Sequence, residues 1–184
     1  MARRGGIWTR LPSADLESAP AKDFLYGVAG RKGPAGSRFP IVWAVGVGAT
    51  SPSDLNSAPL ALRWNGSAFA SVAVPDPSQE SGTSFAAVAL GSGALIGVFA
   101  GGTWRDPASV ADYSGLVMRR VGERWTIRPT PVVVPGHTSN ARSTLNAVLG
   151  AREQMLVEGW CTTASGAQCG FVASGLSSAG STLT

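Results

Sequence analysis

The stretch Pro40-Ile-Val-Trp-Ala-Val-Gly-Val-Gly48 returns, weakened, as Ile96-Gly-Val-Phe-Ala-Gly-Gly102. A second element, Leu25-Tyr-Gly-Val-Ala29, returns as Phe85-Ala-Ala-Val-Ala89 and again as Leu145-Asn-Ala-Val-Leu149, at a spacing of about 60 residues. Short apolar runs that recur at such a spacing are typical of stacked all-β units. We therefore interpret the 184 residues as a single repeat domain.

Each repeat holds four short apolar runs, which we expect to form antiparallel strands. The chain has 24 Gly and 12 Pro, and no long segment has apolar residues at helical spacing, so short strands joined by turns are favoured. Arg63-Trp-Asn-Gly66 and its counterpart Arg119-Arg-Val-Gly122 both end in the glycine that a tight hairpin needs. The predicted units cover about 24–75, 84–131 and 144–175, and residues 6–12 complete the last one.

Four-stranded antiparallel units of this length are typical of β-propeller blades. The order Leu25-Tyr-Gly-Val-Ala29, Val42-Trp-Ala-Val-Gly46 and Leu62-Arg-Trp-Asn-Gly66 resembles the Trp-Ala-Val-Gly blade repeats of bacterial secreted β-propeller proteins, of the kelch and sialidase-like architecture. The likeness is strongest over residues 24–77 and weaker over 84–131. It implies an all-β, partial or half propeller of about three four-stranded blades, and it implies a fold more than an activity.

Three blades are fewer than the roughly four to eight that usually close a propeller ring. The two end blades would each expose an apolar face, and such faces normally find partners. We therefore expect a homodimer that closes a six-bladed ring by cyclic symmetry. The alternative is that the chain is a fragment of a longer propeller.

The formal net charge of +4 invites a nucleic-acid hypothesis, but most arginines are scattered through turns and strand ends. The dense group would split between two faces of a hairpin: Arg119, Arg120, Arg124 and Arg128. No nucleic-acid partner is therefore predicted. No run approaches the ~18 apolar residues of a membrane span. Met1-Ala-Arg-Arg4 resembles the start of a secretion signal without the apolar core, so a cytoplasmic location and an export signal outside this chain both stay open.

Ligand contacts are expected in the long loops 48–57 and 102–113. Trp64 and Trp104 both break the repeat pattern, the first because Arg120 stands at its position. Trp104 is the preferred candidate, with packing as its alternative, and it forms a speculative ligand-binding set with three neighbours: Arg105, Asp106 and Asp112. The predicted function is a non-catalytic binding or scaffold module for a protein or glycan. A lectin or glycosidase is the alternative, although hydrolysis usually requires two carboxylates at a set separation, and we assign no catalytic residue.

His137 is the one histidine, and it has no cysteine near it in the sequence, so neither a metal site nor a cofactor is predicted. Cys161 and Cys169 flank a loop of the last unit, where a disulfide and two free thiols are both open. The resemblance to secreted proteins favours the disulfide, which would imply export to the cell surface or beyond.

Overall fold

The computed structural model describes residues 2–4, 7–9, 23–49, 57–75, 83–91, 97–105, 113–129, 142–151, 154–162 and 167–176. The strands are β1 (Ala2–Arg4), β2 (Ile7–Thr9), β3 (Phe24–Arg31), β4 (Ile41–Ala49), β5 (Ser57–Trp64), β6 (Phe69–Ser71), β7 (Ser84–Gly91), β8 (Gly97–Arg105), β9 (Tyr113–Val121), β10 (Arg124–Pro129), β11 (Arg142–Ala151), β12 (Gln154–Thr162) and β13 (Gln168–Leu176). Every pairing is antiparallel and the described part contains no helix, which confirms the all-β prediction. No described helix could therefore cross a membrane.

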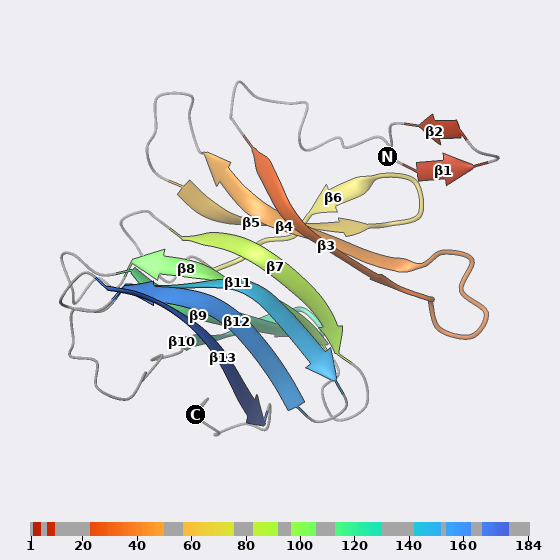
Figure 1. Ribbon diagram of the computed structural model, residues 1–184. Coiled ribbons are helices and arrows are strands. Elements are labelled where there is room, and N and C mark those ends of the chain that lie inside the picture. Colours follow the sequence, from red (N-terminus) through yellow and green to blue (C-terminus); the bar gives the residue numbers. More distant parts are fainter. Residues whose placement is uncertain are drawn as a thin grey trace.

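Three sheets follow one another along the chain (Figure 1). The first sheet has the order β3-β4-β5-β6, the second β10-β9-β8-β7 and the third β11-β12-β13. In each sheet every strand pairs with its neighbour in sequence. The strands of these three sheets thus form antiparallel meanders.

The segment expected to complete the third sheet pairs elsewhere. Strand β2, within the expected 6–12 segment, forms a separate two-stranded hairpin with β1, in which Arg3 opposes Trp8. The physical reason is loop closure. Pairing β2 with β1 closes only the two-residue connection 5–6, and short closures cost the least conformational entropy.

Strand β7 lies at the centre of the fold, in contact with β3 on one side and β11 on the other. The main core fills the space between the first and second sheets: Trp43, Val45, Ala61, Phe85, Val88, Leu116 and Met118. Trp125 adds an edge contact to Trp43, with ring centroids 6.3 Å apart, and stacks on Phe85 at 6.2 Å. The core thus joins elements from two repeats, so neither sheet buries its apolar face alone.

The first strand of each of these three sheets is interrupted at the same repeat position by a register shift typical of a β-bulge. The shifts lie between Leu25 and Gly27 in β3, Phe85 and Ala87 in β7, and Leu145 and Ala147 in β11. The residue paired with the first member of each is a glycine: Gly46, Gly102 and Gly159. A Cβ on Gly46 or Gly102 would collide with the carbonyl oxygen of Phe24 or Ser84. The recurring glycine is therefore the partner that the recurring bulge requires.

Small residues also set the distance between sheets. A Cβ added to Gly27 would lie 3.0 Å from the Cα of Ala87, its counterpart in the next repeat. Arg31 Nη1 donates to the carbonyl of Gly91 at 2.8 Å, and Trp125 Nε1 donates to the carbonyl of Ala73 at 2.9 Å. These bonds bind the second sheet to β3 and to the segment that follows β6, so the two sheets hold a defined orientation.

Candidate functional site

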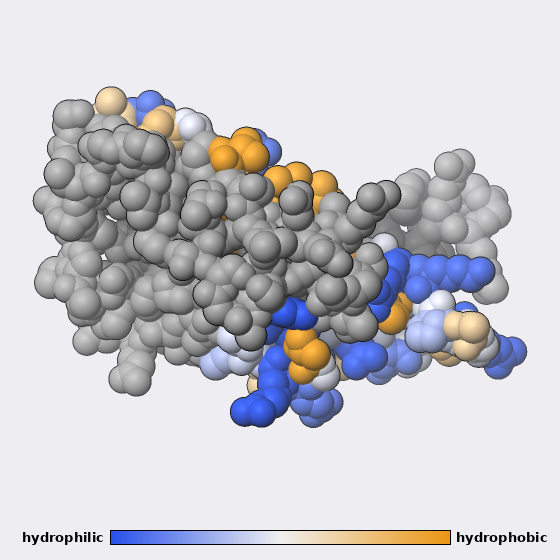
Figure 2. All heavy atoms as spheres, turned by 90° about the horizontal axis from the view of Figure 1, so that it is seen from below, coloured by the Kyte–Doolittle hydropathy of each residue, from blue (hydrophilic) through white to orange (hydrophobic). Residues whose placement is uncertain are grey.

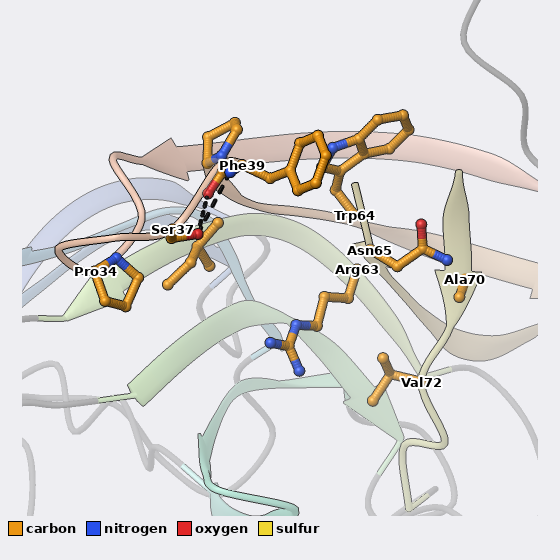
Figure 3. A pocket seen from close by; sticks show the side chains of 10 residues that line it. Pro34, Ser37, Phe39, Arg63, Trp64, Asn65, Ala70 and Val72 are labelled. Atoms are coloured by element: carbon orange, nitrogen blue, oxygen red, sulfur yellow. Dashed lines mark hydrogen bonds between the residues drawn. The ribbon is translucent and has the colours of Figure 1, made fainter. Parts of the chain in front are cut away.

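A pocket of about 560 Å³ opens where the β3–β4 connection, residues 32–40, meets the β5–β6 turn, residues 65–68. It lies at the end of the first sheet at which β4 begins and β5 ends (Figure 3). The described residues that line it are Pro34, Ser37, Phe39, Pro40, Ile41, Arg63, Trp64, Asn65, Ala70 and Val72.

The wall formed by the β3–β4 connection is fixed by its own turn. The amide of Ser37 donates to the carbonyl of Pro34 at 2.9 Å, and Gly36 between them has a φ of 84°, which glycine adopts without strain. The Ser37 hydroxyl donates to the carbonyl of Phe39 at 2.9 Å. These bonds present the Phe39 ring, 48% exposed, at the mouth of the pocket.

The opposite wall is the β5–β6 turn, which is built on Asn65. Its Oδ1 accepts bonds from the amides of Ser67 and Ala68 and from the Ser67 hydroxyl, each 2.9 Å long. Gly66 has a φ of 107°, which agrees with the predicted hairpin glycine. A Cβ on Gly66 would lie 2.7 Å from the Phe39 ring, so the two turns are in contact across the pocket rim.

Aromatic rings and hydrogen-bond donors line different parts of the pocket: the Phe39 and Trp64 rings lie on one side of β5 and the Arg63 guanidinium on the other (Figure 3). The Trp64 ring packs on Phe69 with centroids 5.3 Å apart, which holds it in place. In Figure 3 the Arg63 guanidinium points into the space between the Pro34–Phe39 turn and Val72. Arg63 is exposed and has no ion-pair partner among the residues that the structure describes. Because Asn65 Oδ1 is occupied by the turn, its Nδ2 is the group left to donate outward.

The sequence pattern placed the ligand at the other end of the sheets. Arg31 meets Gly91, so the C-terminal ends of β3 and β7 lie together at the pocket end, and the C-terminal ends of β4 and β8, where loops 48–57 and 102–113 were expected, lie at the opposite end. Trp104 and Arg105 end β8 there, paired with Ser114 and Tyr113. Asp106 and Asp112 lie outside the described residues, as does His137. The described residues contain no group of three metal-ligating side chains.

One signal in the sequence did point to the pocket. Trp64 and Arg120 occupy the same repeat position, since they pair with Phe69 and Trp125 respectively. Arg120 is engaged in the core, with its guanidinium 5.3 Å from the Trp43 ring, whereas Trp64 lines the pocket. The pocket also depends on the length of the β3–β4 connection, which spans 32–40, whereas the equivalent connections span 92–96 and 152–153. The sequence feature that indicates the pocket is therefore a tryptophan that departs from the repeat pattern, in the same unit as a connection that is longer than its counterparts.

Cys161 of β12 and Cys169 of β13 are direct register partners, and Cys169 is disulfide-bonded. The chain has two cysteines, so a bond between them closes the 161–169 loop. We expect replacement of both by serine to lower the free energy of unfolding by about 2–3 kcal/mol, because the open loop regains entropy when the chain unfolds. Thiol titration of the denatured wild type should find no free thiol before reduction. Reaction without a reductant would contradict the pairing.

Comparison with protein-family models, curated proteins and solved structures finds no match to this chain. The functional assignment therefore rests on the residues themselves.

Proposed function

We propose that the chain is a non-catalytic binding module of the β-propeller type that recognises a glycan through the pocket of its first sheet. Three observations support a blade-like role for the sheets: the meander order, the bulge at one repeat position, and the close approach of Gly27 to Ala87. The disulfide-bonded Cys169 supports a location outside the reducing cytoplasm.

The lining of the pocket carries the assignment of the ligand. The exposed Phe39 ring and the half-buried Trp64 ring provide flat apolar surfaces for the C–H faces of a sugar ring. Arg63 offers a planar donor fork that fits a carboxylate in bidentate geometry, and Asn65 adds a neutral donor. Arg63 and Trp64 point to opposite sides of β5, so one sugar ring cannot use both: a carboxylated sugar, such as a uronic acid residue, would meet Arg63 while a neighbouring sugar of the same glycan stacks at the Phe39 and Trp64 rings.

The same lining favours binding over hydrolysis. None of the described residues that line the pocket is acidic. Glycoside hydrolysis usually uses two carboxyl groups on opposite sides of the bond that is cleaved. The carbohydrate-active alternative would therefore have to use residues other than those described in this pocket.

Binding should be measured by calorimetry with a glucuronic acid-terminated oligosaccharide and with its glucose-terminated counterpart. We expect the acidic ligand to bind more tightly. Arg63→Gln should weaken it by roughly 10- to 100-fold, because a charge-assisted hydrogen bond is lost, while binding of the neutral ligand changes little. Trp64→Ala should weaken both ligands, because the stacking surface is lost.

Trp104→Ala is the matched control, because it removes a tryptophan at the opposite end of the second sheet. Its affinity for both ligands should equal that of the wild type. Loss of binding in Trp104→Ala together with unchanged binding in Trp64→Ala would move the site to the far loops and refute the pocket. Absence of binding to either ligand would refute the glycan proposal.

A further inference from the structure

The first and third sheets each leave one face without a partner sheet among the described strands, whereas the second sheet is covered on both sides. Large apolar side chains are exposed on both end sheets, and hydrophobic patches are visible along the upper rim in Figure 2. The first sheet exposes Leu25 and Val28, and the third exposes Leu149, Leu156, Trp160 and Val172. We call these two sets the first end face and the third end face.

The third end face carries the residues that are equivalent to those with which the first sheet packs on the second sheet. In the first sheet Ala29 pairs with Trp43, and in the third sheet Leu149 pairs with Leu156 at the same repeat position. Trp43 is 2% exposed, because the second sheet covers it, whereas Leu156 is 37% exposed. The third sheet therefore presents a packing face without its neighbour.

The first end face carries the residues that are equivalent to those with which the second sheet packs on the first sheet. Leu25 pairs with Gly46 as Phe85 pairs with Gly102, and Val28 pairs with Ala44 as Val88 pairs with Ala100. Phe85 and Val88 are buried in the core between the first two sheets. Val28, at the position of Val88, is 71% exposed. At Leu25 and Val28 the first end face thus corresponds to the second-sheet side of a contact that the chain already makes once, whereas Ala44 and Leu62, on the same face farther from β3, are already buried within the chain.

We infer that the third end face of one copy of the chain binds the first end face of a second copy, and that the contact is made twice around a two-fold axis. Within one chain the two faces cannot meet, because the second sheet lies between them. A contact between two different faces closes into a ring when the rotation between copies allows it. If both contacts repeat the packing between the first and second sheets, the two copies form a closed ring of six sheets.

One charged side chain on the third end face limits the affinity. Glu158 is exposed there, and it pairs with Ala147 and Val172 as Val45 of the first sheet pairs with Gly27 and Ala61. Its carboxylate loses water when the second copy docks. The dimer should therefore dissociate measurably on dilution, and the mass must be followed over a range of concentrations.

The test is light scattering behind size exclusion. The wild type should have a mass near twice 18.8 kDa that falls toward 18.8 kDa on dilution. Val28→Glu and Val172→Glu should each be monomeric at every concentration, because each places a charge in both contacts. Both side chains are over 70% exposed, so the fold should be unchanged by circular dichroism. Val121→Glu, 48% exposed at the end of β9, is the matched control and should dimerise like the wild type.

An equimolar mixture of the two monomeric variants distinguishes the ring from other dimers. In the mixed pair, the third end face of Val28→Glu and the first end face of Val172→Glu are both unaltered and can bind one another. The mixture should therefore recover a species of twice the monomer mass. A monomeric wild type overturns the inference, and so does a dimer that survives either substitution. Masses that grow beyond the dimer overturn the closed ring. Leu149→Asp, which alters the third end face at a second position, should repeat the Val172→Glu result.

Discussion

Gly102→Ala is expected to lower the free energy of unfolding by about 3 kcal/mol or more. Gly102 lies in β8 opposite the bulge of β7, and an added Cβ would collide with the carbonyl oxygen of Ser84. That oxygen belongs to the backbone of the central strand, so the collision cannot be relieved by rotating a side chain. Either the bulge or the spacing of the β7–β8 pair must change, and both support the core residue Phe85. Urea denaturation followed by tryptophan fluorescence measures the change.

Gly170→Ala is the matched control. Gly170 lies in β13, and a Cβ there would meet nothing within 4 Å. Its substitution should change the free energy of unfolding by no more than about 0.5 kcal/mol. Equal effects at Gly102 and Gly170 would show that the bulge relaxes around a methyl group, and the explanation of the recurring glycine would then be wrong.

Phe85→Ala is expected to cost about 3–5 kcal/mol, because it removes a fully buried ring and leaves a cavity. Phe85 is 0% exposed and stacks on Trp125, and it packs in the cluster that joins the first two sheets. Its loss removes contacts on both sides of that interface. The transition midpoint in urea should fall with little change in its slope, provided unfolding stays two-state.

Leu25→Ala tests the same repeat position in the first sheet. Leu25 pairs with Gly46 as Phe85 pairs with Gly102, yet it is 43% exposed. Its substitution should cost about 1 kcal/mol or less when the protein is dilute, since half of the side chain is already in water. A cost equal to that of Phe85→Ala in dilute protein would mean that burial does not distinguish the two positions.

Local sequence signals predicted the strands and their pairing. The recurring runs at Leu25, Phe85 and Leu145 each became the first strand of a sheet, and Gly66 and Gly122 both adopt the positive φ expected of hairpin glycines. These features depend on neighbouring residues and on alternating burial, which a sequence displays directly. The all-β class follows from the same signals.

Features that depend on distant contacts were not predictable. The bulges shift register without a residue type of their own: Tyr26, Ala86 and Asn146 occupy the shifted positions. The strand with which β2 pairs depends on whether a short connection to β1 or a long loop to another sheet is closed. The residues around β2 do not show which of these occurs.

The candidate site shows the same limit. Trp64 and Trp104 both broke the repeat, and the sequence favoured Trp104 because it was expected in the long loop 102–113, whereas it lies in β8 and pairs with Ser114. The described pocket forms where the long β3–β4 connection meets the short β5–β6 turn, with Phe39 from one and Asn65 from the other. Contact between turns separated by a strand pair is a tertiary property, so the choice between the two tryptophans required the fold.

The meander order has a consequence for how the chain folds and varies. Because each strand pairs with its sequence neighbour, a whole sheet can assemble from contacts that are close along the chain, and such local assembly is fast. Docking of sheets then depends on side chains such as Trp43 and Phe85 and follows as a separate step. Removal or duplication of one complete sheet would break no ladder of backbone hydrogen bonds. Length variants of this protein should therefore differ by whole sheets.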